Sequence, residues 1–560
     1  MPAHDVPVLV VGAGPSGVMA ALLLDRLGVP TRIVERRPGP QRAPAAHVVN
    51  ARTLEICRAA GVDMAALESA AKDPADAGFA CFVTKLGGRM LGRLPFERQG
   101  DDQRAVTPTP LRNLSQNKFE PILVAALERN AGRRVEWRQQ WESSEPAAGG
   151  VCSRIRDLES DEVHEITSRF LIAADGAGSR LRKSLGIGVA GPDRIQSFIM
   201  VHFRAKLRGI PGIPPGVLFF VCDPTAGGGV FVIHDLDGEA VYMHSFDPAV
   251  ESEASYDAER CAGIVREALA EPDLDLDVEN VGSWLMTAQV ADRYREGAVF
   301  LVGDAAHRFP PTGGLGLNTG VQDAHNLAWK LAAVHHGWAP ASLLASYERE
   351  RRPVARHNAD QSLRNALRLI EVSQALGVTD FSEESGARME ATLADEAGMR
   401  RVREAIERQA EHFDMPGLQL GFRYGAGALV PEEGAADAPP DLRRFEPSGA
   451  PGSRLPHAWL ADGQTSVLDL VPDDRFLLLA GPEGASWRAA ADAFGAVPHE
   501  LHVLRTDRVP EIDAWLKAAG IGSDGALLVR PDQHVAWRAR SASPDPSRTL
   551  EEALHVILQA

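Results

Sequence analysis

The chain has 560 residues, 44% of them hydrophobic and 24% charged, which is typical of a globular protein with room for about three or four domains. It carries 59 Lys and Arg against 76 Asp and Glu, and the formal net charge of −17 argues against nucleic acid or an anionic membrane surface as a main partner. No stretch approaches the roughly 20 apolar residues of a transmembrane helix, and no basic leader precedes the first apolar run, so we expect a cytoplasmic protein.

The N-terminal segment predicts a strand, a glycine-rich turn, a helix and a second strand. Apolar residues run over 6–11, helical spacing follows over 16–27, and a second apolar run ends on Glu35. This order is typical of a fold that binds a dinucleotide, and the pattern does not decide between NAD and FAD. Glu35 lies where a carboxylate would accept a hydrogen bond from a ribose hydroxyl.

Each glycine of the turn GAGPSG has a separate expected role. Gly12 permits the tight turn, Gly14 lets a pyrophosphate approach the backbone, and Gly17 lets the helix pack on the strand. The phosphates would then meet the positive end of the helix. The expected nucleotide contacts in this turn are Gly12, Gly14, Pro15, Ser16 and Gly17.

Arginines follow the second strand. Arg36, Arg37 and Arg42 form a basic turn beside the expected ribose and pyrophosphate, and Arg52 opens a predicted helix over 53–60. Such a cluster is more often only a solvated face. Next to a nucleotide motif we expect it to balance the charge of a diphosphate.

The next segments predict a hairpin over 79–96, with its turn at Gly87-Gly88, and an amphipathic helix over 114–130. Ser115 is a plausible cap for that helix, and Gln116 lies in its first turn. Strands are expected over 135–138 and 169–173.

Two further motifs each place a carboxylate at the end of a strand. The first is the turn Asp175-Gly176 after the strand 169–173. The second is Gly303-Asp304 after a strand over 299–302, followed by the glycine-rich loop 310–316 and a long helix from about Asn318 to His335. Such a carboxylate could accept from a sugar-like hydroxyl, and the loop could present a row of backbone N–H donors.

These three motifs together resemble the single-component FAD-dependent aromatic hydroxylases, the group that includes para-hydroxybenzoate hydroxylase and phenol hydroxylase. They occur in the family's order and spacing across residues 1 to about 370. The resemblance implies an α/β protein with a para-hydroxybenzoate-hydroxylase-like FAD-binding domain, an antiparallel sheet that binds substrate, and a C-terminal thioredoxin-like domain. The expected divisions are 1–190 for the first part of the FAD-binding domain, with 77–113 contributing to the substrate domain; 191–288 for the substrate-binding domain; 289–420 for the second part and bracing helices; 421–456 for a linker; and 457–560 for the thioredoxin-like domain.

The resemblance also implies the cofactor contacts. FAD would occupy the first turn, the Asp175 turn would serve both FAD and passing NAD(P)H, and Asp304 would hold the ribitol. The backbone from Pro311 to Asn318 would cradle the isoalloxazine, while Arg52 and Gln116 match family positions that contact FAD. The full expected set is Gly12, Gly14, Pro15, Ser16, Gly17, Glu35, Arg36, Arg42, Arg52, Gln116, Asp175, Gly176, Gly303, Asp304, Pro311, Gly314, Gly316, Leu317 and Asn318.

Residues 191–288 change to strands separated by turn signals, which matches the family's substrate domain. Alternation puts Tyr242, His244 and Phe246 on one face of this sheet. The helical region 351–412 is expected to brace the FAD-binding domain or to form a subunit contact, so a homodimer is one expected assembly.

The C-terminal region predicts the element order βαβαββα, and the segment VRPDQHVAWR resembles a signature of the phenol-hydroxylase branch. The five cysteines of the chain form no CxxC pair and no cluster with histidine, and none lies beyond Cys261. We therefore expect no metal site and no dithiol exchange in this domain.

The implied reaction uses NADPH or NADH to reduce FAD, forms a flavin C4a-hydroperoxide with O2, and hydroxylates a phenolic or related aromatic substrate. A phenol must lose its proton to react, so a base must lie within hydrogen-bond reach. His47 falls where the yeast-type phenol hydroxylases have a catalytic aspartate and chlorophenol-hydroxylase-like members have histidine. We expect His47 to be the base, with Tyr242 and Pro311 as further catalytic candidates. A Baeyer–Villiger oxygenase on the same fold and a non-catalytic flavin-binding redox protein are the alternatives.

Overall fold

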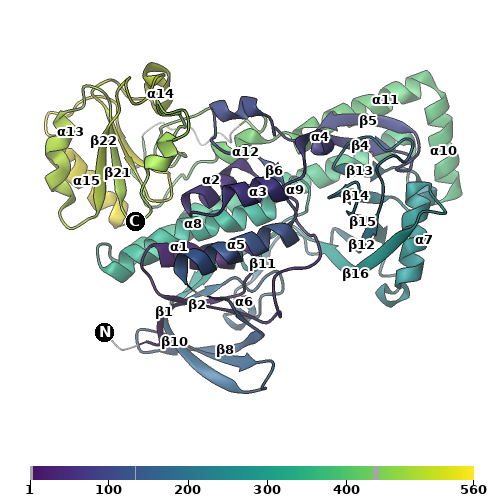
Figure 1. Ribbon diagram of the computed structural model, residues 1–560, viewed down its shortest axis with the longest axis horizontal. Helices are drawn as coiled ribbons and strands as arrows, with labels where there is room; N and C mark the ends of the chain where they lie inside the picture. Colours follow the sequence, from purple (N-terminus) through teal and green to yellow (C-terminus); the bar gives the residue numbers. More distant parts are fainter. Residues whose placement is uncertain (1–3, 133, 433–440, 560) are drawn as a thin grey trace.

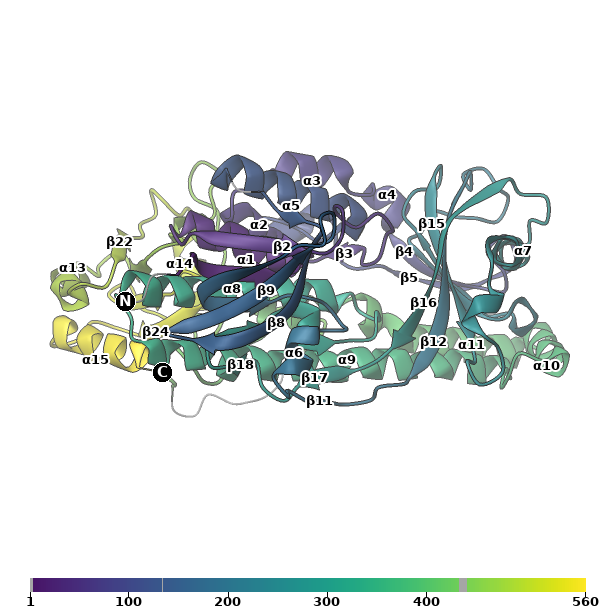
Figure 2. The same cartoon turned by 90° about the horizontal axis from the view of Figure 1, so that it is seen from below.

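The computed structural model describes residues 4–132, 134–432 and 441–559, so residues 433–440 of the expected linker lie outside the described part. Three parts follow one another along the long axis of the molecule (Figure 1). The C-terminal domain lies at one end, a middle domain contains the N-terminal strands, and a second sheet lies at the other end. The long helix α9 (Ser346–Leu376) runs from the middle domain to that second sheet (Figures 1 and 2).

The middle domain is built on an eight-stranded sheet with the strand path β18-β19-β10-β1-β2-β7. Its outer strands are β18 (Arg295–Glu296), β19 (Val299–Leu301) and β7 (Glu136–Trp137). In it, β1 (Val6–Val11) pairs in parallel with both β10 (Val163–Ala173) and β2 (Thr31–Glu35). β1 is almost wholly buried, as its unbroken apolar sequence requires. These bounds confirm the predicted first strand and the end of the second strand at Glu35.

One hairpin of this sheet was not predicted. β8 (Gln139–Ala147) pairs with β9 (Gly150–Asp157), and β9 pairs with the first half of β10, which therefore begins well before the expected residue 169. Most of β8 is polar and at least partly exposed. Neither an apolar run nor a clean alternation marks such a strand in the sequence.

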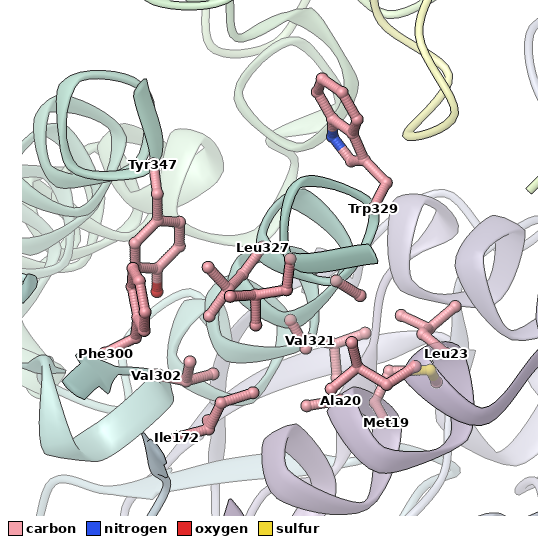
Figure 3. Packing of buried hydrophobic residues seen from close by; sticks show 14 of the residues in the cluster. Met19, Ala20, Leu23, Ile172, Phe300, Val302, Val321, Leu327, Trp329 and Tyr347 are labelled. Carbon is pink, nitrogen blue, oxygen red and sulfur yellow. The ribbon is translucent and has the colours of Figure 1, made fainter. Parts of the chain in front are cut away.

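Helix α8 (Leu315–His336) is a core element of the middle domain, because every residue from Asn318 to Val334 is buried. Figure 3 shows Val321 and Leu327 of this helix between side chains of α1 (Pro15–Arg26) and side chains of the sheet. Tight packing on both sides fixes the position of the helix.

The second sheet has seven strands in the order β16-β12-β15-β14-β13-β4-β5. The strands β4 (Phe79–Val83) and β5 (Met90–Pro95) form the predicted hairpin and join this sheet through β13. The other strands are β12 (Gln196–Ala205), β13 (Leu218–Val221), β14 (Gly229–Ile233), β15 (Glu239–Phe246) and β16 (Leu276–Met286).

The two faces of the second sheet have different neighbours. One face packs on α7 (Ala258–Leu269). The opposite face carries Phe198, Val241 and Met243, which cluster with Ala366 of α9. This second face therefore looks toward the middle domain.

The C-terminal domain contains a four-stranded sheet in the order β22-β21-β23-β24. Its strands β21 and β22 are parallel, and the other pairs are antiparallel. In chain order its elements are β21 (Phe476–Ala480), α13 (Ser486–Ala489), β22 (His499–Val503), α14 (Ile512–Ala519), β23 (Ala526–Val529), β24 (Val535–Ala539) and α15 (Pro546–Leu558). The predicted βαβαββα order is confirmed.

Several shorter helices complete the fold, and α10 and α11 extend the part of the molecule that carries the second sheet (Figure 1). Their bounds are α2 (Ala51–Ala59), α3 (Met64–Ala70), α4 (Pro74–Ala77), α5 (Gln116–Ala131), α6 (Arg180–Ser184), α10 (Glu383–Ala394), α11 (Glu396–Glu407) and α12 (Pro416–Gly421). Across the described ranges, no helix combines the length and apolar character that a membrane span needs.

A buried ionic cluster joins the C-terminal domain to the middle domain. Arg530, in the turn between β23 and β24, donates to both carboxylate oxygens of Glu350 at 2.8 Å and also pairs with Asp532. Lys330 of α8 donates to Glu350 at 2.7 Å. Burial alone would raise the pKa of Glu350, but Arg530 and Lys330 lower it to about 2. Because these side chains are at most 1% exposed, each charge depends on its partners.

Replacing Arg530 should therefore destabilise the protein strongly. Arg530→Ala leaves two buried carboxylates with Lys330 as the remaining cation, and removing one partner of a buried pair typically costs about 3–5 kcal/mol. We expect a loss of that size in the free energy of unfolding, measured by urea titration with tryptophan fluorescence. The matched control is Arg548→Ala, because Arg548 pairs with Glu552 on the surface and should contribute less than about 1 kcal/mol. Equal stability of the two variants would contradict this account.

Candidate active site

The turn between β1 and α1 leaves open space at one glycine. A Cβ on Gly12, whose φ is +104°, would lie 2.2 Å from the carbonyl oxygen of Ala174, and a Cβ on Gly17 would lie 2.0 Å from that of Gly12. No atom lies within 4 Å of a Cβ built on Gly14, which caps α1. Gly12 and Gly17 are thus required by the packing of the protein, whereas Gly14 opens onto space that a phosphate could occupy at the helix N-terminus.

Ser16 brings this turn against the third motif. A Cβ on Gly303 would lie 2.6 Å from Ser16 Oγ, and one on Gly320 would lie 2.2 Å from the same atom. Pro15 occupies the first turn of α1, where the missing N–H costs no intrahelical hydrogen bond. Segments nearly 300 residues apart in sequence therefore meet at one place, as the three motifs predicted.

Glu35 ends β2 beside the glycine turn. Its carboxylate is buried and accepts hydrogen bonds from the N–H groups of Ala13 at 2.8 Å and Arg37 at 2.9 Å. A carboxylate offers about four acceptor positions, so Glu35 keeps capacity for a ribose hydroxyl. The side chains of Arg36, which follows Glu35 directly, and of Arg42 are exposed.

Gln116 lies in the first turn of α5 and donates to Glu120 at 2.6 Å. Glu120 is buried and also accepts from the backbone N–H of Gln41 at 2.8 Å and from Arg37 at 3.4 Å. Gln116 and Glu120 thus hold the basic turn against α5. The predicted FAD contact of Gln116 stays a prediction.

The Asp175 turn follows β10 and caps α6. Its carboxylate accepts from Ser179 Oγ at 2.6 Å and from the N–H of Leu181 at 3.1 Å. Gly176 has φ of +82° and open space around it. The observed bonds explain the acid as a structural cap, and its expected role toward nucleotides stays a prediction.

Asp304 presents a carboxylate that no described residue engages by hydrogen bond or ion pair. The side chain is exposed, but desolvation by the surrounding protein raises its pKa. Its neighbour Gly303 is fixed, because the Gly303 N–H donates to Asp323 at 3.2 Å and Asp323 also pairs with His307 and Arg351. The fixed backbone of Gly303 is therefore followed by a carboxylate that has acceptor capacity for a ligand hydroxyl.

The glycine-rich loop leads into α8, which begins at Leu315 rather than near Asn318 as predicted. Gly314 caps the helix with φ of +61°, and a Cβ there would lie 2.7 Å from the Val48 side chain. Gly316 has no atom within 4 Å of a built Cβ, and Pro311 is exposed. Gly316 and Leu317 therefore belong to the first helical turn, whose backbone N–H groups have no intrahelical acceptor, and Asn318 follows them.

Asn318 binds this helix start to the segment that carries His47. Its Oδ1 accepts from the N–H of Asn50 at 2.9 Å, and its Nδ2 donates to the carbonyls of Val48 at 2.9 Å and Gly314 at 2.6 Å. Asn50 in turn caps α2 through the N–H of Thr53. An Asn before a predicted helix is a recognised cap signal, so Asn50 could have been found from sequence.

These features fit FAD. Two helix N-termini, those of α1 and α8, offer N–H donors for the anionic pyrophosphate and the electron-rich ring system. Gly14 and Gly316 leave the backbone approachable, and Asp304 is a free acceptor for the ribitol. Within the described ranges, no group of three or more His, Cys, Asp or Glu is placed to hold a metal ion.

Arg52 has partners that were not predicted. Its guanidinium is 1% exposed and donates to Gln533 at 2.6 Å, to the carbonyl of Asp532 at 2.8 Å and to Glu55 at 3.1 Å. Arg52 and Glu55 share one face of α2, and Glu55 also pairs with Arg454, so this face meets the C-terminal domain. Only Arg52 Nε lacks a partner among the described residues. The observed bonds explain Arg52 as a contact to the C-terminal domain, and its predicted contact with FAD stays a prediction.

Tyr242 packs on the face of the second sheet that is turned away from the middle domain, and its predicted catalytic role stays a prediction. It lies on the face of β15 that packs on α7, opposite Val241 and Met243, which look toward the middle domain. Its ring stacks on Phe231 with centroids 4.3 Å apart, and its hydroxyl donates to the carbonyl of Gly228 at 3.1 Å. Alternation along the strand did place Tyr242 with Phe246, but it could not show which face roofs the site.

His47 lies at the boundary between the middle domain and the second sheet. Its ring stacks on Phe96 and meets His234 edge-on, each with centroids 6.0 Å apart. Nδ1 lies 3.1 Å from Asn113 Oδ1. Burial lowers the pKa of His47 to about 4, because the surrounding protein and the charge of Lys72 disfavour the imidazolium, although the Asn113 bond opposes this. No sequence signal singled out Lys72, Asn113 or His234.

Known proteins resemble the chain over its whole length. The family described as FAD binding domain matches residues 5–362, and the family described as aromatic-ring hydroxylase, C-terminal, matches residues 448–560. The tetracenomycin A2 monooxygenase-dioxygenase of Streptomyces glaucescens is 34% identical, over 100% of this chain and 98% of that protein. The 2,4-dichlorophenol 6-monooxygenase of Cupriavidus pinatubonensis is 33% identical, over 99% of this chain and 96% of that protein.

Solved structures agree with these matches. The flavin-dependent monooxygenase PieE in complex with FAD and substrate superposes with a TM-score of 0.91 at 35% identity, over 100% of both chains. The ternary complex of aklavinone-11 hydroxylase with FAD and aklavinone gives 0.82 at 32% identity, also over 100% of both chains. The chain therefore belongs to the FAD-binding aromatic-ring hydroxylases and is an FAD-dependent monooxygenase.

Proposed function

We propose that this enzyme hydroxylates a phenolic ring and that His47 accepts the phenolic proton. The observation that carries the proposal is the place of His47 in the chain fold. The next residue, Val48, packs on Gly314 and accepts from Asn318, at the helix start where the flavin ring is expected. His47 itself faces His234, which follows β14 of the second sheet. It thus lies between the two parts that would enclose the substrate.

His47 is in the protonation state that a base needs, and a cation lies close to it. With a pKa of about 4, the imidazole is neutral at pH 7 and can accept a proton. Lys72 lines the same pocket as His47 and donates to the carbonyls of Gly216 at 2.9 Å and Ile233 at 2.8 Å. Burial lowers the pKa of Lys72 to about 8, so most of it is charged at pH 7. A cation close to the base favours the phenolate that the proton leaves behind.

When bound, FAD supplies the electron transfer and the activation of O2. The protein holds the cofactor and handles the proton. We assign the pyrophosphate to Gly14 and the N-terminus of α1, the ribitol to Asp304, and the ring system to the backbone N–H groups at the start of α8. The carboxylate of Glu35 keeps acceptor capacity for the ribose.

The substrate class and the reductant follow from the same proposal. Relatives about one-third identical are named for 2,4-dichlorophenol and 4-methyl-5-nitrocatechol, and others for tetracenomycins and aklavinone. This range supports an electron-rich ring that carries a hydroxyl group, single or fused. We propose NADPH or NADH as the reductant, since the class of reaction needs an external electron donor. A cytoplasmic location and a homodimer stay predictions.

The cofactor assignment predicts that Gly14→Val folds but holds little FAD. Gly14 has φ of −73° and ψ of 178°, which valine can adopt, and its Cβ meets no protein atom within 4 Å. A loss of FAD in this variant would therefore come from a clash with the cofactor. Asp304→Ala should weaken FAD binding about 10- to 100-fold, the worth of a hydrogen bond to a charged group.

FAD content is measured as the ratio of flavin to protein absorbance, and affinity by titration of the apoprotein. Gly263→Val and Asp273→Ala serve as controls, because both positions are exposed and lie outside the proposed cofactor contacts. Normal FAD affinity in both site variants would refute the assignment.

The base assignment predicts that His47→Ala keeps FAD and uncouples the reaction. A neutral phenol reacts poorly, and general-base assistance is worth about 10² to 10⁴ in rate. NAD(P)H should still be consumed, while hydrogen peroxide accumulates and hydroxylated product falls. Raising the pH toward about 10, the ordinary pKa of a phenol, should partly restore product because solvent then supplies the phenolate.

The control for this variant is His164→Ala, since His164 is also partly exposed but lies on β10, away from the proposed site. Product and peroxide are quantified per NAD(P)H consumed with a panel of phenols. Wild-type coupling in His47→Ala at pH 7 would show that His47 is not the base.

A further inference from the structure

Gln99 has one allowed orientation of its side-chain amide. It follows β5, is 8% exposed, and places its Nε2 3.0 Å from the carbonyl oxygen of Phe96 and 3.2 Å from that of Ala77. A backbone carbonyl can only accept a hydrogen bond. The group that faces these two oxygens must therefore be the NH2 of the amide, which leaves Oε1 as an acceptor for another partner.

That partner is Asn113, whose own orientation follows from Gln99. Asn113 is 3% exposed, and its Nδ2 donates to Gln99 Oε1 at 3.0 Å. Its Oδ1 therefore faces His47 Nδ1 at 3.1 Å. An amide oxygen can only accept, so the proton of the neutral imidazole must be on Nδ1, and Nε2 must carry the lone pair.

The backbone holds these three side chains in register. Val48 pairs with Asn113 in the short ladder of β3 (Val48–Val49) and β6 (Arg112–Asn113). The N–H of Leu114 donates to the carbonyl of His47 at 2.8 Å, and the N–H of Lys72 donates to the carbonyl of Asn113 at 2.8 Å. The segments that carry His47 and Asn113 are therefore fixed by backbone bonds, while Gln99 is fixed by the two carbonyls that its amide contacts.

We propose that Gln99 and Asn113 are positioning residues that hold His47 in the tautomer with its proton on Nδ1, so that Nε2 accepts the proton of the substrate. The catalytic consequence depends on the proposed role of His47 as the base. In the proton transfer, the phenolic O–H bond breaks, the proton binds Nε2, and the electron pair stays on the phenolate oxygen. The imidazolium then keeps its Nδ1–H bond to Asn113. In the other tautomer Nε2 would already carry a proton and could not accept one.

The charged surroundings explain why this acceptor matters. Lys72 and His234 face the ring of His47, and the charge of Lys72 disfavours the imidazolium. Asn113 is the neighbour whose hydrogen bond raises the pKa of His47 and so supports the protonated state. A neutral amide oxygen gives this support without adding a buried charge.

The tautomer can be measured directly in the full-length, FAD-loaded enzyme. The protein is labelled with 15N-histidine, and the two ring nitrogens of His47 are assigned from the difference spectrum with His47→Gln. We expect a protonated Nδ1 and an unprotonated Nε2 in the wild type, and a mixture of tautomers in Gln99→Leu and Asn113→Leu. The control is Gln409→Leu, because Gln409 is also a buried amide whose Nε2 donates to two carbonyls, those of Arg368 and Ala405, without a link to His47.

A double variant tests the relay by rescue. In Gln99→Leu the amide of Asn113 is free to turn, but in Gln99→Leu/Asn113→Asp a carboxylate replaces it and can only accept. The double variant should therefore restore the Nδ1 proton. Its charge should also raise the pKa of His47, so that product per NAD(P)H falls at a higher pH on acidification than in the wild type.

The outcomes separate this inference from the proposed function. Identical His47 spectra in the wild type, Gln99→Leu and Asn113→Leu would overturn the relay. A change of tautomer together with a loss of product formation of roughly tenfold or more would support it, since removal of the base itself costs about 10² to 10⁴. A change of tautomer with unchanged coupling would keep the relay and refute His47 as the base.

Discussion

The position of helix α8 depends on two adjacent residues of α9. Arg351 donates to Asp323 at 2.7 Å, while Glu350 accepts from Lys330 at 2.7 Å and from Asn326 at 2.6 Å. All of these side chains are fully or almost fully buried. A buried charge without its partner is costly, so these bonds must all be made in the folded state. Charge as well as apolar packing therefore sets how α9 lies on α8.

The position of α9 on α8 matters because α8 begins at the proposed flavin site and its other end meets the C-terminal domain. Asp323 also holds the N–H of Gly303, and Asn318 holds Val48 and Gly314. Farther along, the same helix shares Glu350 with Arg530 of the C-terminal domain. A domain without cysteine can thus support the flavin site without any redox chemistry, by completing the charge balance of the helix that shapes it.

The motifs predicted most of the middle domain, because each is contiguous and its glycines have local reasons that a sequence can show. Gly17 meets the backbone of Gly12 within the same strand-turn-helix unit, so the spacing of the glycines is enough to recognise the unit, whereas Gly12 also meets the backbone of Ala174 after β10. The sequence did not predict which partners the side chains of Arg52 and Tyr242 contact. Arg52 comes soon after a nucleotide motif in sequence, yet its guanidinium is bound by Gln533, which is 481 positions away. For Tyr242, strand alternation predicted that Phe246 lies on the same face, but it could not predict that α7 packs on that face.

The hydrogen bonds from Gln99 through Asn113 to His47 could be predicted from the sequence even less. The orientation of Gln99 is decided by the backbone carbonyls of Phe96 and Ala77, and every residue type supplies such a carbonyl. The amino acids at positions 77 and 96 therefore do not indicate that their carbonyl groups orient Gln99. Even the identity of Asn113 would leave the tautomer of His47 undecided, because an amide can turn either its oxygen or its nitrogen to the ring. The tautomer of His47, and with it the chemistry available at Nε2, is therefore determined by where the end of α4 and the segment after β5 place their carbonyl groups, and only a three-dimensional structure contains that information.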